Sequence, residues 1–105
     1  MKRYHRRSLP PPPQFVRLAL LLASPVRWAM LYELALHDLV SVKHLAAISG
    51  LTSSAASMHV RVLKKTRIIE QGMGRLYRLT AAYRPPPGQD YLDFGMCRLM
   101  LPPKA

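Results

Sequence analysis

The chain has 105 residues, which is enough for one domain with a single modest core. Hydrophobic residues make up 50% of it, which excludes a chain that is disordered throughout. Its 16 Lys and Arg residues against 5 Asp and Glu residues give a net charge of +11, and such a field attracts polyanions such as nucleic acids. The single cysteine, Cys97, excludes an intramolecular disulfide framework and thus the class of small disulfide-rich secreted proteins.

Residues 1–13 are predicted to form a flexible tail. A basic cluster at residues 1–7 is followed by four consecutive prolines at 10–13, and polyproline favours a stiff, extended segment without backbone donors. The tail either contacts nucleic acid or remains a solvated end. The apolar run at 18–23 is too short for a signal-peptide core or a membrane span, so we expect a cytoplasmic protein without a membrane partner.

Two helices are predicted next along the chain. Residues 14–22 are apolar on most sides, which favours a short buried helix. Ser24 followed by Pro25 is typical of an N-cap with proline in the first helical position. The second helix is predicted to run to about Leu36 and to bury a stripe with fourfold spacing, made of Val26, Met30 and Leu34.

A further pair of helices follows with a tight turn between them. Ser41 is predicted to cap a helix over residues 42–49, and Gly50 stands where a left-handed C-terminal residue is needed. The segment Thr52-Ser53-Ser54 offers the next N-cap. The helix that follows is predicted to span about residues 53–65 and to bury Ala56, Val60 and Leu63.

The hydrophobic period then changes to that of strands. Residues 67–71 and 75–80 read as two strands joined by the turn Gly72-Met73-Gly74. Three helices followed by a hairpin predict a mainly α fold with a small β-hairpin wing, a winged helix-turn-helix, over residues 14–84. Residues 85–105 are predicted to form a C-terminal extension, in which 91–101 is either an extra strand or a dimerisation helix.

Basic residues gather on the last predicted helix and the hairpin. Between residues 61 and 78 the single acid is Glu70, and the cations are Arg61, Lys64, Lys65, Arg67, Arg75 and Arg78. A solvated surface would more often interleave acids as partners four residues apart. The stripe therefore predicts a face that binds duplex DNA.

Four stretches of the chain resemble the ArsR-type winged helix-turn-helix regulators over about residues 15–80. They are Leu22-Ala-Ser-Pro-Val-Arg27, His44-Leu-Ala-Ala-Ile-Ser-Gly-Leu51, Thr52-Ser-Ser-Ala-Ala-Ser-Met-His-Val-Arg-Val-Leu63 and Gly74-Arg-Leu-Tyr-Arg-Leu79. The resemblance implies a homodimeric transcriptional regulator whose recognition helices, about residues 53–65, enter successive major grooves. The wing, about residues 67–80, would then lie on the DNA backbone.

The resemblance and the basic stripe together give the expected DNA contacts. They are Thr52, Ser53, Ser54, Ser57, Met58, His59, Arg61, Lys64, Lys65, Arg75 and Arg78. Met58 and Arg67 depart from the pattern, which usually has Arg and Gly at these positions. The stretch 33–38 lacks the cysteine pair that binds arsenite or metal in the family.

No catalytic or cofactor site is predicted. The serines at 53, 54 and 57 have no acid–base partner nearby, and no phosphate-binding loop is present, so we expect a protein that is not an enzyme. His37, His44, His59 and Cys97 show no metal-ligand spacing, so neither a metal nor a small-molecule ligand is expected.

Two other functions remain open at this stage. One is a winged-helix protein-interaction module whose basic face docks on an acidic partner. The other is an RNA-binding winged helix, against which the absence of an interleaved aromatic platform counts.

Overall fold

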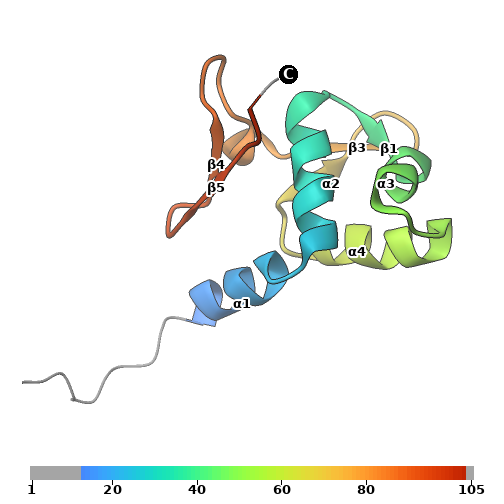
Figure 1. Cartoon of the computed structure of the whole chain (residues 1–105), viewed down its shortest axis with the longest axis horizontal. Helices are drawn as coiled ribbons and strands as arrows, with labels where there is room; N and C mark the ends of the chain where they lie inside the picture. The colour runs from blue at the N-terminus through green and yellow to red at the C-terminus, as the bar shows by residue number, and fades with distance from the viewer. Residues whose placement is uncertain (1–12, 104–105) are drawn as a thin grey trace, which may run out of the picture.

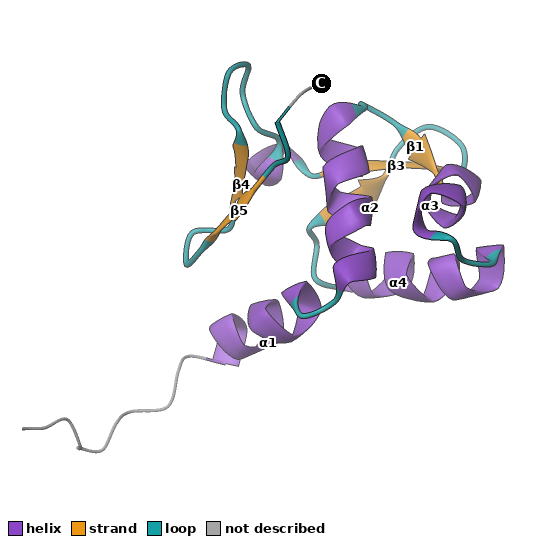
Figure 2. Cartoon of the chain, viewed as in Figure 1, coloured by secondary structure: helices purple, strands orange, loops and turns teal. Residues whose placement is uncertain are grey.

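The computed structural model describes residues 13–103, so the predicted tail lies almost wholly outside the described residues. Four α-helices and five short strands follow one another along this part of the chain (Figures 1 and 2). The elements are α1 (Pro13–Leu22), α2 (Pro25–Leu36), β1 (Val40–Ser41), α3 (Val42–Ser49), α4 (Ser53–Lys65), β2 (Ile69–Gln71), β3 (Leu76–Leu79), a 3-10 turn (Ala81–Tyr83), β4 (Tyr91–Asp93) and β5 (Arg98–Met100). The architecture is therefore mixed α/β, with four helices and small antiparallel sheets.

The first two helices begin and end where the sequence predicts, but α1 is not buried. The hydroxyl of Ser24 accepts a hydrogen bond from the backbone N–H of Arg27 at 3.3 Å, which caps α2. Of α1, only Leu21 is buried. The prediction of a buried helix is wrong because α1 bends away from α2 by 90° and packs on the remaining fold only near its end (Figure 1).

Helices α3 and α4 confirm the predicted caps and the tight turn. The hydroxyl of Ser41 accepts from the N–H of His44 at 3.0 Å, and that of Thr52 accepts from the N–H of Ala55 at 3.1 Å. Gly50 has a φ of 67°, the left-handed conformation that glycine adopts without a side-chain clash. The predicted stripe of α4, made of Ala56, Val60 and Leu63, is buried.

The first sheet has the order β1-β3-β2 and joins the predicted hairpin to the segment between α2 and α3. Ile69 pairs with Leu79 across β2 and β3, and Val40 pairs with Tyr77 across β1 and β3. The hairpin strands are shorter than predicted. Strand β2 begins at Ile69 because Arg67 has a φ of 64° and ends α4. Strand β1 has only two residues and was not predicted from the sequence.

The C-terminal extension forms a second hairpin. The prediction of β structure for residues 91–101 is confirmed in type, but two strands, β4 and β5, replace one, and the alternative of a dimerisation helix is wrong. Gly95, with a φ of 86°, lies in the turn between them. Leu92 and Leu99 pair across the hairpin and are buried against the rest of the fold.

One hydrophobic core links the helices and both sheets. Its fully buried large side chains are Met30, Leu31, Leu45, Leu63, Ile69, Leu79 and Leu92. Within residues 13–103 no charged or polar residue is buried. In the same range no single helix is long and apolar enough to cross a membrane, and α1 and α2 meet that criterion only as a pair bent by 90°.

Candidate nucleic-acid interface

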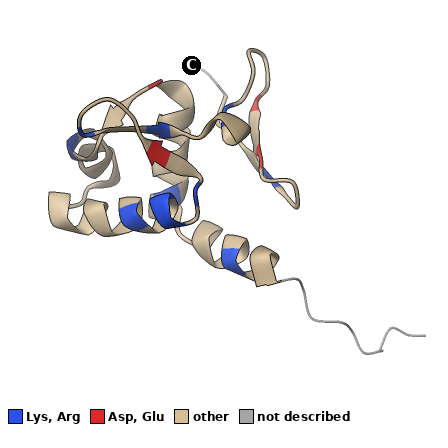
Figure 3. Cartoon of the chain, turned by 180° about the vertical axis from the view of Figure 1, so that it is seen from behind, with Lys and Arg blue, Asp and Glu red and all other residues tan. Residues whose placement is uncertain are grey.

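Helix α4 presents a polar face opposite its buried stripe. Ser53, Ser54, Met58 and Arg61 are exposed there, and Ser57 is half-buried. The first half of the helix carries no charge, whereas Arg61, Lys64 and Lys65 follow in the second half. Figure 3 shows the basic residues gathered in that second half and in the loop after it. This helix therefore offers hydrogen-bonding groups at its beginning and positive charge at its end.

A shallow recess of about 180 Å³ lies where α4 meets α3 and the hairpin. Ser57, Arg61 and Lys64 line it from α4, Val42 from α3 and Tyr77 from β3. None of the chain's five acids is on α4. The structure thus brings two predicted cations beside the central strand of the sheet, with no carboxylate on their own helix to neutralise them.

The tip of the β2–β3 hairpin carries Arg75. The N–H of Gly72 donates to the carbonyl of Leu76 at 2.7 Å, and the side-chain amide of Gln71 donates to the carbonyl of Gly74 at 2.6 Å. These two bonds order the turn, which leaves Arg75 exposed at the tip. Arg75 therefore lies in the turn of the predicted wing and not, as the sequence suggested, in its second strand.

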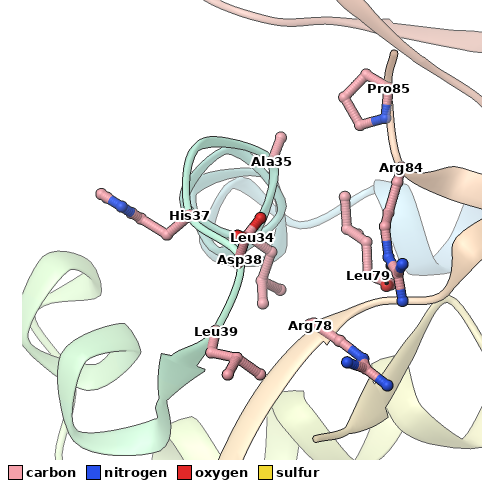
Figure 4. Close-up of a pocket in the computed structure, with 9 residues that line it drawn as sticks. All are labelled: Leu34, Ala35, His37, Asp38, Leu39, Arg78, Leu79, Arg84 and Pro85. Carbon is pink, nitrogen blue, oxygen red and sulfur yellow. Dashed lines mark hydrogen bonds between the residues drawn. The ribbon is translucent and has the colours of Figure 1, made fainter. Parts of the chain in front are cut away.

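Arg78 lies elsewhere, which corrects its expected place on the same face. Its Nε donates to Glu70 Oε2 at 2.8 Å, and Arg84 Nη2 reaches the same oxygen at 3.3 Å. The two arginines line a different recess, of about 440 Å³, opposite Leu34 of α2 (Figure 4). Side chains alternate along a strand, so Arg78 points away from the recess that the preceding Tyr77 lines beside α4.

His59 is tied to α2. Arg27 Nε donates to His59 Nδ1 at 3.3 Å, while Arg27 Nη1 donates to the carbonyl of Leu21 at 2.9 Å. Burial, together with the nearby Arg27 charge, lowers the pKa of His59 below its usual value. One ring nitrogen of this predicted DNA contact is therefore already occupied by Arg27, a partner that the sequence did not predict.

Three predicted DNA contacts on α4 are exposed, as a DNA-binding role requires, and a fourth, Thr52, also caps the helix. Lys64 and Lys65 are exposed in the last turn of α4, and Met58 is 66% exposed. Thr52 caps α4 through its hydroxyl, so its side chain serves the helix as well as lying at the proposed interface.

The histidines at 37 and 44 are not isolated, contrary to the prediction from their spacing. Both ring Nε2 atoms approach Glu33 Oε2, at 3.2 Å for His37 and 2.6 Å for His44. The Glu33–His37 pair, four residues apart on one helix face, was the available signal in the sequence. His44 could not be paired with them because it belongs to the next helix.

No protein-family model matches this chain, and no curated protein sequence is significantly similar to it. The functional interpretation therefore depends on the geometry of the described residues.

Proposed function

We propose that the chain is a winged helix-turn-helix protein that binds duplex DNA as a homodimer and regulates transcription. Helix α4 would enter the major groove, and the β2–β3 hairpin would act as the wing on the backbone. The observation that carries the proposal is the acid-free face of α4, with serines in its first half and Arg61, Lys64 and Lys65 in its second half.

The two halves of α4 suit different parts of DNA. Short hydroxyl side chains such as those of Ser53 and Ser54 let a helix come close to base edges, whereas lysine and arginine bind phosphates. Arg75, at the tip of the hairpin, would contact a neighbouring phosphate. In a winged helix-turn-helix this division would make α4 the source of specificity and the wing a source of affinity.

The homodimer is supported by apolar side chains that the fold leaves exposed. Leu20 on α1 is 68% exposed and Trp28 on α2 is 42% exposed, and α1 extends beyond the rest of the fold (Figure 1). An apolar helix in that position gains stability by packing on a second copy. Two-fold symmetry would place the half-sites about one helical turn of DNA apart.

The proposal is tested with the purified full chain and a pool of random DNA duplexes. Selection of bound duplexes should enrich a palindromic sequence. If about six phosphates are neutralised, log K plotted against log salt concentration should have a slope near −5. Binding that is independent of salt, or no enrichment together with binding to an acidic polypeptide, would favour the protein-interaction module instead.

A further inference from the structure

Three potential metal ligands meet at the junction of α2 and α3. Glu33 is on the last turn of α2, His37 is its C-cap and His44 is in the first turn of α3. Their ligand atoms all lie within 4.8 Å of one another. The rings of His37 and His44 stand edge to face, with centroids 6.0 Å apart.

The backbone at this junction fixes both histidines. His37 is extended, with a φ of −128°, and its N–H donates to the carbonyl of Glu33 at 3.1 Å. The chain then passes through β1 to Ser41, whose hydroxyl accepts from the N–H of His44. The three side chains therefore converge because α2 ends and α3 begins at defined residues.

The side chains are accessible to an ion in solution. The exposed fractions are 20% for the Glu33 side chain, 55% for His37 and 46% for His44. The two histidines also line an open recess of about 310 Å³ together with Leu39 and Leu76. A cation could enter from this side without any movement of the backbone.

We propose that Glu33, His37 and His44 bind one divalent transition-metal ion of the zinc type, at a site that joins α2 to α3. Two imidazole nitrogens and a carboxylate oxygen form a donor set suited to zinc. Ligand atoms around tetrahedral zinc are about 3.3 Å apart, so side-chain rotations alone would bring these three into place. Three protein ligands leave a fourth position for water or another ligand.

The same residues could instead form only a hydrogen-bonded cluster, in which the two histidines share the Glu33 carboxylate. The two possibilities differ in their response to added zinc. A metal site binds one ion with all three side chains, so the loss of any one of them weakens binding. A cluster that is only hydrogen-bonded would bind no stoichiometric zinc.

Calorimetric titration of chelator-treated full-length protein with zinc chloride at pH 7.5 tests the proposal. We expect one zinc per chain and a thermal unfolding midpoint that rises by several degrees with zinc, because the ion binds only the folded arrangement. His37→Ala and His44→Ala should each weaken binding at least tenfold, and Glu33→Gln should weaken it as well. His5→Ala, His59→Ala and Cys97→Ser are the matched controls and should bind as the parent protein does.

Circular dichroism would establish that the variants are folded. In the unaltered chain, paramagnetic Co²⁺ should broaden the ring proton signals of His37 and His44 before those of His59. Unchanged zinc binding in His37→Ala and His44→Ala, or no binding to the folded parent protein, would overturn the proposal. The titration contains no DNA, so its result is independent of the proposed regulatory function.

Discussion

Helices α3 and α4 end in the same hydrogen-bonding pattern with different residues in the left-handed position. In α3 the N–H of Leu51 donates to the carbonyl of Ala46, and in α4 the N–H of Ile68 donates to that of Leu63. Both are Schellman motifs, in which the residue just before the donating N–H adopts a positive φ. That residue is glycine in α3 but Arg67 in α4, where the side chain costs about 1–2 kcal/mol in this conformation.

We therefore expect Arg67→Gly to stabilise the protein. The relief of backbone strain is partly offset by the entropy of glycine in the unfolded chain, which leaves a gain of about 0.5–1 kcal/mol in the free energy of unfolding. Gly50→Ala is the matched opposite and should lose about 1 kcal/mol, although no atom lies within 4 Å of the added methyl group. Denaturant unfolding measures both. If Arg67→Gly proves less stable, the strain argument fails.

The burial of His59 beside Arg27 makes stability depend on pH. The pKa of His59 is lowered by burial and by the Arg27 charge, so the folded state binds the proton less tightly than the unfolded state does. The contribution is present above about pH 6.5, the ordinary histidine value, and is lost as the pH falls through the folded pKa. Histidine NMR titration should give His59 a pKa below 6.5, and Arg27→Gln should move it upwards. A pKa at or above 6.5 would contradict the geometry.

At the scale of elements, the two halves of α4 should separate specificity from affinity. Thr52 caps the helix, so capping is not the role of Ser54 or Ser57. If the first half of α4 lies in the major groove, Ser54→Ala with Ser57→Ala should lower the preference for the selected site and leave non-specific binding nearly intact. Competition binding against random duplex measures the ratio, and a melting curve serves as the control. An unchanged ratio would mean that α4 is not the recognition helix.

The wing should contribute charge without sequence preference. Arg75→Ala is expected to weaken binding about equally on all duplexes and to make the salt slope shallower by about two units, because the dimer loses one phosphate contact from each wing. The control is Arg98→Ala, which removes an equal charge from the β4–β5 hairpin, where the guanidinium stacks on Tyr91 at 4.5 Å. Equal effects of the two substitutions would show that only net charge matters.

At the scale of the whole molecule, the exposed helix α1 bears on the proposed dimer. Leu20→Glu should give a monomer by light scattering at micromolar concentration, because a charge in an apolar interface is costly. Met73→Glu, at a residue of the β2–β3 turn that is 76% exposed, should leave the mass unchanged. A monomeric parent protein under the same conditions would refute the homodimer.

Local patterns in the sequence predicted most of the helices and their ends. The caps at Ser24, Ser41 and Thr52 are confirmed because each depends only on a hydroxyl and a backbone N–H three residues away. The buried stripe of α4 follows equally from helix periodicity. Within the predicted interface, exposure of Ser54 and Arg61 could be read from the same period.

The features that could not be predicted from the sequence depend on neighbours that are distant along the chain. The exposure of α1 follows from its angle to α2, which no local pattern encodes. Strand β1 has two residues, too few for a period, and exists because β3 lies beside it. Likewise, the ion pair of Arg78 with Glu70 and the meeting of His44 with Glu33 join side chains from different elements.

The strand order of the two sheets indicates which strand pairs form first during folding. The pairs β2–β3 and β4–β5 are hairpins, and α3 packs on the helix that follows it, so their contacts close only short loops. The pairing of Val40 with Tyr77 instead joins segments separated by two helices and a strand. Because closing a longer loop costs more entropy, local units are expected to form first and quickly, with β1 joining last. With only two paired residues, β1 is also expected to open before the β2–β3 hairpin, which Ile69 and Leu79 hold in the core.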